Sequence, residues 1–309
     1  MKSLNFRTDS FAKKYFFLLM GIAIVCWACA FPVIQIGLRE LTPINLTIMR
    51  LFLVSLIFLL FILIAPKKFS KLHKKDILPI FLLGFFGVTV YHLGLNYGEQ
   101  YISASAASLI IATSPIFVVI IAAVFLKEKI TKKIILGILL SLAGVLIISV
   151  AGIPNNAVEI TYMTAAVAVF IAALMSAYYT TTGKKLLARY SALSLTVYAI
   201  VLGSLGLLPF ISTSLFDQVS SLSLSGWSAV FFLALFPTVI GYVLWYVALE
   251  QKSASEVSVY LYFIPVLSTI ISFFLFQTPI TLFFILGGAL VILGLVIVNK
   301  KNNTVVQEQ

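Results

Sequence analysis

The chain has 309 residues, of which 61% are hydrophobic and 10% are charged, and its formal net charge at pH 7 is +11. The hydrophobic residues are gathered into long runs, which is typical of an integral membrane protein and excludes a soluble globular domain. The basic excess does not indicate nucleic-acid binding, because nearly all of the lysines and arginines lie at the termini or in alternate gaps between those runs.

Ten apolar segments follow one another along the chain, and most have the roughly 20 residues that a helix needs to cross a bilayer. The run at 52–65 is apolar on every face, which favours helices over the alternating strands of a membrane barrel. Lipid offers no hydrogen-bond partners, so each segment must satisfy its own amides as a helix. The sequence therefore predicts an all-α membrane protein with ten transmembrane helices. The segments are 15–36, 43–64, 77–97, 103–126, 134–151, 162–182, 192–211, 226–249, 255–276 and 280–299.

The positions of the basic residues predict the orientation of these helices. Of the 21 lysines and arginines, 19 lie in the gaps of one side; Arg39 lies on the other side and Arg50 lies within the second segment. By the positive-inside rule the basic side is the cytoplasm. We therefore expect a cytoplasmic N-terminal tail at 1–14 and a cytoplasmic C-terminal tail at 300–309.

An internal repeat relates the two halves of the chain at an offset of 150 residues. The stretch "SASAASLIIATSPIF" at 103–117 returns as "SASEVSVYLYFIPVL" at 253–267. Fifteen of the 47 positions aligned from 103 to 149 are identical, and they include three Ser, one Pro, one Thr and two Gly. Five helices per repeat is an odd number, so the second copy crosses the membrane in the opposite sense. This predicts two five-helix repeats of inverted topology around a central site, an arrangement suited to alternating access.

The order of these motifs resembles the EamA family of the drug/metabolite transporter superfamily. The resemblance rests on "NLTIMRLFLVSLIFLL" at 45–60, on "SASAASLIIATSPIF" followed by "LKEKIT" and "GILLSLAGVLII", and on their echoes in the second half. It covers about residues 15–299, with a first EamA repeat at 15–151 and a second at 162–299. It implies a multi-pass permease or exporter of amino acids or other small metabolites in the inner, or plasma, membrane. One departure is "FQTPIT" at 276–281, which lacks the acidic residue of "LKEKIT".

Two prolines lie about twelve residues into their segments, near the predicted centre of the bilayer. They are Pro115 and Pro265, which correspond by the 150-residue offset. A proline inside a helix removes one hydrogen bond and frees a carbonyl, which a membrane tolerates only where the carbonyl is buried or lines a cavity. We interpret both prolines as part of a site or gate; the alternative is a simple packing kink.

Polar residues of the third segment correspond to tyrosines of the eighth. His92 and Asn96 map onto Tyr242 and Tyr246, and each pair has the i, i+4 spacing that places both side chains on one helix face. They predict a central polar site, although such residues also bridge neighbouring helices in membranes. A histidine in a membrane segment is also a candidate proton sensor.

Aromatic residues accompany these positions. Trp27, Tyr178, Trp245 and Tyr260 are candidates for the transport pathway, and Trp245 and Tyr260 are favoured because they lie at mid-depth in the predicted helices. The alternative is interfacial or lipid-facing packing, which is common for membrane aromatics. If these side chains line a cavity, they favour an apolar, aromatic or zwitterionic cargo.

Charged residues are rare within the segments. Arg50 should face protein instead of lipid. It is either an anchor for a substrate anion or a structural residue that binds helix-end carbonyls or snorkels, and the structural role is favoured because its repeat partner is Ile200. One arginine is too few for a phosphorylated cargo. Coupling to protons through His92 or Glu256 and passive facilitation both stay open.

Glycines of the fifth segment predict a close helix contact. Gly137 and Gly144 repeat as Gly287 and Gly294, on one face of each helix. Packing within the chain is favoured over a homodimer contact through the fifth and tenth helices, so both a monomer and a homodimer stay open.

Two other classes of function compete with a metabolite transporter. A membrane enzyme is disfavoured, because we find no metal-ligand set, nucleophile cluster or phosphate-binding loop, and no cofactor is implied. A lipid or polyprenyl-carrier flippase is the nearest rival among transporters and would need a lateral groove.

Overall fold

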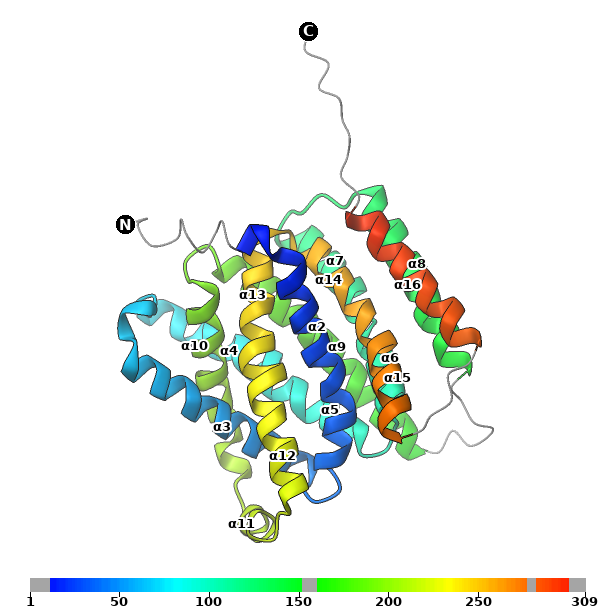
Figure 1. The fold of residues 1–309 in the computed structure, drawn as a ribbon. Coiled ribbons are helices and arrows are strands. Elements are labelled where there is room, and N and C mark those ends of the chain that lie inside the picture. Colours follow the sequence, from blue (N-terminus) through cyan, green and yellow to red (C-terminus); the bar gives the residue numbers. More distant parts are fainter. Residues whose placement is uncertain (1–11, 152–159, 277–281, 300–309) are drawn as a thin grey trace.

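The computed structural model describes residues 12–151, 160–276 and 282–299, and over these ranges the chain is helical without any strand (Figure 1). Eight helical stretches there are long and apolar enough to cross a membrane, and a ninth apolar stretch, Ile285–Val298, is shorter. The predicted all-α membrane class is thus confirmed. Most of the two predicted tails, and all but the first residue of "FQTPIT", lie outside the described residues.

The first half of the chain forms five consecutive helical regions, two of which are interrupted. Thr42 caps the second region by accepting a hydrogen bond from the backbone N–H of Asn45 at 3.3 Å, and Pro43 follows at the first helical position. The elements are α2 (Phe16–Gly37), α3 (Pro43–Ile64), η1 (Pro66–Lys68), η2 (Lys74–Asp76), α4 (Ile77–Gly84), η3 (Phe85–Val90), α5 (Tyr91–Glu99), α6 (Ala104–Ile111), α7 (Ser114–Phe125) and α8 (Lys132–Ala151).

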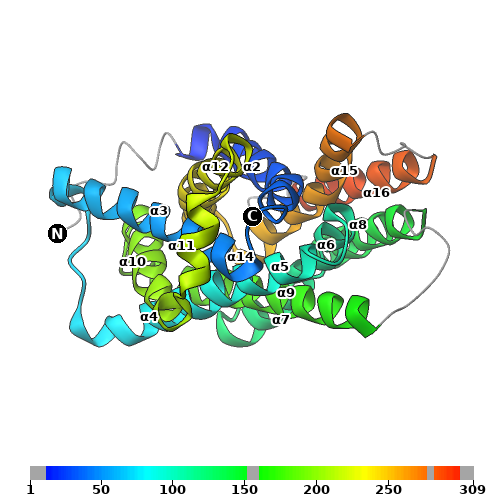
Figure 2. The ribbon, with the colours of Figure 1, turned by 90° about the horizontal axis from the view of Figure 1, so that it is seen from below.

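The second half follows the same order, with one added surface helix, α11. Its elements are α9 (Ile160–Leu186), α10 (Ala192–Ser204), η4 (Leu205–Phe210), α11 (Thr213–Ser220), α12 (Leu224–Leu233), η5 (Ala234–Ile240), α13 (Gly241–Gln251), α14 (Ala254–Ser258), η6 (Val259–Tyr262), α15 (Phe263–Phe276) and α16 (Leu282–Asn299). The helices α3, α4 and α10 lie at one edge of the molecule, and α8 with α16 lie at the other (Figure 2).

The interruptions occur at corresponding places in the two halves. η3 and η5 are π-helical turns within the third and eighth regions. In the fourth and ninth regions the α-helix stops and restarts, so that Pro115 lies in the first turn of α7 and Pro265 is the third residue of α15. A first-turn proline removes no helical hydrogen bond. The expected mid-helix kinks are therefore helix breaks just before each proline.

The glycine faces predicted in the fifth and tenth segments meet within this chain. A Cβ added at Gly144 would overlap the carbonyl oxygen of Gly287, and one added at Gly137 would lie 2.9 Å from that of Gly294. The helices α8 and α16 therefore pack backbone to backbone, side by side in Figure 1. The interpretation as internal packing is confirmed.

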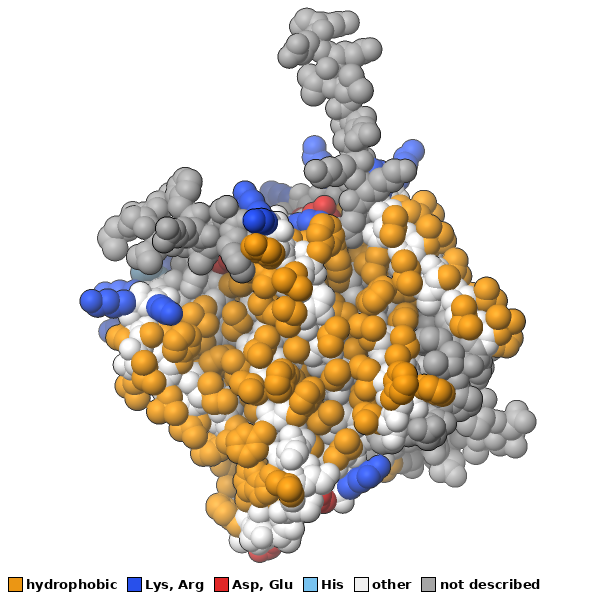
Figure 3. Space-filling model, viewed as in Figure 1, with side chains coloured by type: hydrophobic (Ala, Val, Ile, Leu, Met, Phe, Trp, Pro, Cys, Tyr) orange, Lys and Arg blue, Asp and Glu red, His pale blue; other side chains and the backbone are white. Residues whose placement is uncertain are grey.

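The outer surface is apolar over its middle. Large side chains such as Leu63, Phe125 and Leu224 are exposed, and Figure 3 shows a nearly continuous hydrophobic face. Most of the Lys and Arg visible on that face lie at the end of the molecule where the described chain begins and finishes. Such a surface suits a bilayer and would be unstable in water.

Candidate functional site

The middle of the bundle encloses a cavity of about 50 Å³, which is room for a few water molecules. Its walls come from both halves of the chain: α2, α3, η3, α5 and α6 from the first, and α9, α13, η6 and α15 from the second. Five of the predicted site residues line it. These are Trp27, Arg50, His92, Tyr242 and Trp245.

A π-helical turn shapes one wall of the cavity. Gly87 in η3 lines the cavity beside Tyr179 of α9, and a Cβ at Gly87 would lie 2.6 Å from the Tyr179 Cβ. Glycine is therefore required for the tyrosine ring to reach the cavity. π-Helical turns are frequent at functional sites because the extra residue redirects the side chains around it.

His92 and Tyr242 lie in direct contact at the cavity. The His92 Nε2 and Tyr242 hydroxyl are hydrogen-bonded at 3.2 Å, and the second ring nitrogen, Nδ1, is buried without a partner. The Tyr242 ring also packs edge-on against Trp27 and Tyr179, with centroids 5.9 Å and 5.2 Å apart. The two members of this predicted pair, which are 150 residues apart in the sequence, are therefore in direct contact.

The second predicted pair is directed elsewhere. The Asn96 amide donates to the Thr47 hydroxyl at 2.9 Å, and the Tyr246 hydroxyl donates to the Tyr179 carbonyl at 3.2 Å. Both side chains are fully buried, and neither lines the cavity. In this conformation they hold neighbouring helices together, which is the alternative that the sequence left open.

Two tryptophans form an aromatic wall with Tyr242. The rings of Trp27 and Trp245 are 5.1 Å apart. Each indole N–H is fixed by a hydrogen bond, from Trp27 to the Pro237 carbonyl at 2.8 Å and from Trp245 to the Thr180 hydroxyl at 3.2 Å. The rings are thus held rigidly and present apolar faces to the cavity.

Arg50 supplies the positive charge of the cavity. Its side chain is 2% exposed, so the snorkelling interpretation is wrong. The Nε–H donates to the Thr238 hydroxyl at 2.7 Å, whereas the terminal nitrogen Nη1 is buried without a hydrogen-bond partner. Buried polar groups are usually satisfied, so this nitrogen is available to bind an anion.

The other predicted residues lie away from the cavity. Pro115 and Pro265 are buried in the first turns of their helices, and Tyr178 and Tyr260 are half-buried outside the cavity lining. Glu256 belongs to the cap of α14, where its carboxylate accepts hydrogen bonds from the backbone and hydroxyl of Ser253.

Three residues around this centre lie outside the predicted set of site residues. Tyr91 and Tyr179 line the cavity, and Glu99 is buried at the end of α5. The signal for Glu99 was present, because residues 92, 96 and 99 share one helix face. Tyr179 follows the predicted Tyr178 in the sequence and lines the cavity where it packs closely on Gly87.

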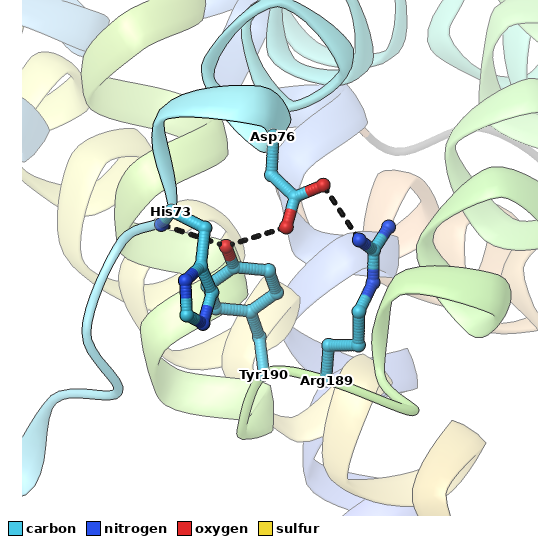
Figure 4. A network of polar contacts seen from close by, with 4 residues as sticks. All are labelled: His73, Asp76, Arg189 and Tyr190. Atoms are coloured by element: carbon cyan, nitrogen blue, oxygen red, sulfur yellow. Dashed lines mark hydrogen bonds and ion pairs between the residues drawn. The ribbon is translucent and has the colours of Figure 1, made fainter.

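Polar contacts join helix ends at both ends of the bundle. At one end Asp76 accepts hydrogen bonds from Arg189 at 2.7 Å and from the Tyr190 hydroxyl at 2.9 Å, and that hydroxyl accepts from the His73 backbone (Figure 4). At the other end a second carboxylate joins the connection after α2 to the start of α12.

That second contact is between Glu40 and Ser223. The Ser223 hydroxyl donates to Glu40 at 2.6 Å and its backbone N–H donates at 2.7 Å. These hydrogen bonds lower the pKa of Glu40.

An apolar-surfaced helical bundle with several stretches long enough to cross a bilayer and a small central cavity defines a multi-pass membrane protein. The chain belongs to the EamA-like transporter family, whose model matches residues 14–150 and 163–300. It is therefore a membrane transporter, and the plasma membrane is its expected location.

Individual relatives are similar over nearly their whole length. An uncharacterized transporter of Archaeoglobus fulgidus is 37% identical over 284 residues, which is 92% of this chain and 98% of the relative. A probable terminal-alkyne amino-acid exporter of Streptantibioticus cattleyicolor is 33% identical, over 91% of this chain and 92% of its own. A protein of known crystal structure, 18% identical, matches with a TM-score of 0.71 over 91% of this chain and 95% of its own, which shows the fold alone.

Proposed function

We propose that this transporter exports amino acids or other small zwitterionic or apolar metabolites by alternating access. The observation that carries the proposal is the central cavity, which Arg50 lines together with the aromatic residues Trp27, Tyr242 and Trp245, and the Arg50 Nη1 has no hydrogen-bond partner. A carboxylate would bind the guanidinium in a charge-assisted hydrogen bond. The rings would pack on an apolar side chain. The similarity to a relative named as an amino-acid exporter supports this class of cargo.

The size of the cavity bears on the mechanism. About 50 Å³ is far below the roughly 300–1,000 Å³ of ordinary ligand pockets. The helices must therefore separate to admit cargo, and the contacts at the two ends, Asp76 with Arg189 and Glu40 with Ser223, would open in turn. Single guanidinium recognition disfavours cargo with several phosphate groups.

The proposal includes ten membrane spans in two inverted repeats, 15–151 and 162–299, with both termini in the cytoplasm. It is supported by the π-helical turns at matching places, by the contact of α8 with α16, and by the hydrogen bond between His92 and Tyr242, which are 150 residues apart. Pairs related by a two-fold axis meet where they lie close to that axis.

The proposed topology predicts the location of two inserted reporters. A reporter fused after Asn156, which lies outside the described residues, is expected to be external because the fifth span ends there. One fused after Arg189 is expected to be cytoplasmic, since basic connections stay inside. Paired phosphatase and fluorescent-protein fusions measure both positions. The opposite pair of results would exclude this orientation.

The export proposal predicts a change in the metabolites around living cells. Media from overexpressing cells, compared with media from deletion cells, are expected to be enriched in one or a few amino acids or related zwitterions, as measured by mass spectrometry. Tyr242→Ala should remove the enrichment without lowering membrane abundance, because it removes the ring that packs on the His92 side of the cavity.

The matched control is Tyr97→Ala on α5. Tyr97 is 38% exposed and does not line the cavity, so this variant should export normally. Profiles of amino acids, amines and drugs that match the deletion strain would contradict the export proposal and favour the flippase.

A further inference from the structure

Glu99 is an acidic residue whose burial the transport site described so far does not explain. It is the last residue of α5, its side chain is 3% exposed, and both carboxylate oxygens are buried without a hydrogen-bond partner. Asp76 is the only other buried acid over the described residues, and its oxygens are bound by Arg189 and Tyr190. An isolated buried carboxyl group is stable as the neutral acid or beside a cation, because a lone charge would lose its hydration.

The position of Glu99 connects it to the cavity. Residues 91, 95 and 99 are spaced by four and share one face of α5. Tyr91 and Leu95 line the cavity, so Glu99 continues the cavity-facing stripe by one turn. It lies beside the connection 100–103, which is external in the proposed topology. The hydrogen bond from Asn96 to Thr47 at 2.9 Å holds this part of α5 against α3, the helix that carries Arg50.

Arg50 and Glu99 interact electrostatically, but their side chains form no ion pair. Opposite charges held apart in this way match the carboxylate and ammonium groups of a zwitterion. A carboxylate would bind the free Nη1 of Arg50, and an ammonium group would find two unpartnered oxygens at Glu99.

Few other groups can compete for a proton near Glu99. Tyr91, on the same helix, interacts with both Glu99 and Arg50. Among the elements packed on α5, α2 adds Cys26 and Cys29, while the described side chains of α9 add Tyr178, Tyr179 and two lysines in its last turn. The elements η3 and α6 add no titratable group, and α3 adds only Arg50. His92 is the remaining titratable group on the cavity side of α5 and forms its own bond with Tyr242.

We propose that Glu99 is the residue that binds the ammonium group of the cargo and exchanges it for a proton, an inference that rests on the proposed export of zwitterions. The ionised carboxylate binds the ammonium group. After the cargo leaves to the outside, a proton from that side binds the same carboxylate and is released when the next cargo binds from the cytoplasm. Because one carboxylate cannot hold both, cargo and proton move in opposite directions.

The first test observes the proton on Glu99 without any cargo. Infrared spectra of the full-length protein in lipid nanodiscs, recorded during a pH titration, report the C=O stretch of protonated carboxyl groups. Glu99→Gln is expected to remove one titrating band. Glu99→Asp is expected to keep the band but to titrate at a shifted pH. The comparison of the two variants separates loss of the proton site from misfolding. Asp76→Asn is the matched control at the other buried acid and should keep the band. A spectrum unchanged by Glu99→Gln overturns the proposal.

The second test counts protons when cargo binds. An equimolar mixture of neutral amino acids, added to weakly buffered protein, is expected to release protons from the wild type and none from Glu99→Gln. The corresponding acids without an amino group should release none from either protein. Binding of the amino acids without proton release, seen as quenching of tryptophan fluorescence, overturns the role of Glu99 and leaves the export proposal standing. If neither mixture binds, both proposals fail.

Discussion

Replacing Arg50 by lysine is expected to weaken the binding of carboxylate cargo roughly 10- to 100-fold, the equivalent of losing one charge-assisted hydrogen bond of about 1.5–3 kcal/mol. Lysine keeps the positive charge but lacks the Nε–H that binds Thr238 at 2.7 Å. It also lacks the planar guanidinium fork, whose Nη1 has no hydrogen-bond partner in the structure. The affinity is measured by quenching of tryptophan fluorescence in nanodiscs, with the mixture of neutral amino acids as the probe.

Arg39→Lys is the matched control for this substitution. Arg39 is exposed in the connection between α2 and α3, so the same chemical change should leave the affinity unaltered there. A thermal unfolding curve for each variant separates weaker binding from weaker folding. Equal affinity in Arg50→Lys and the wild type would contradict the anion-binding role of Arg50 and support the structural role that the sequence favours.

The order of the helices was largely predictable, because lipid imposes long apolar runs. The segment predicted at 43–64 matches α3 (Pro43–Ile64) at both ends, where Thr42 and Pro43 are strong helix-start signals. The interruptions were not predictable from those runs. At Gly87 the interrupted helix packs closely on Tyr179, which is a contact between the two halves. Tertiary contacts of this kind leave no periodic pattern in the sequence.

The sequence repeat predicted part of the candidate site, namely the residues that occupy equivalent positions in the two halves and contact each other. His92 and Tyr242 were paired by the offset alone, and they are hydrogen-bonded. Tyr246 was paired by the same argument, but its ring stacks on Tyr179 at 4.7 Å, outside the cavity. Glu99 lies just beyond the predicted segment 77–97, where exposure is usual. Its burial arises from the packing of α9 and α6 on the end of α5, which a single segment does not reveal.

Replacing Gly84 by alanine is expected to destabilise the folded protein by about 1–3 kcal/mol, the usual cost of overpacking a close contact. Gly84 is where α4 packs on α10. An added Cβ would overlap the carbonyl oxygen of Ala199 and lie 3.0 Å from the Cα of Gly203. Both obstacles are backbone atoms, so no side-chain rotation relieves the clash and the two helices must move apart. The melting temperature in detergent should fall, together with the amount of protein in the membrane.

Gly21→Ala is the matched control, because it makes the same change in another membrane helix. A Cβ at Gly21 meets nothing within 4 Å, so the variant is expected to be neutral or to gain up to about 1 kcal/mol from the better helix propensity of alanine. The contrast isolates the contact of α4 with α10, since both substitutions alter helix propensity in the same favourable direction. If both variants melt at the same temperature, the backbone contact between these helices does not limit stability, and α4 and α10 must be able to separate without loss of the fold.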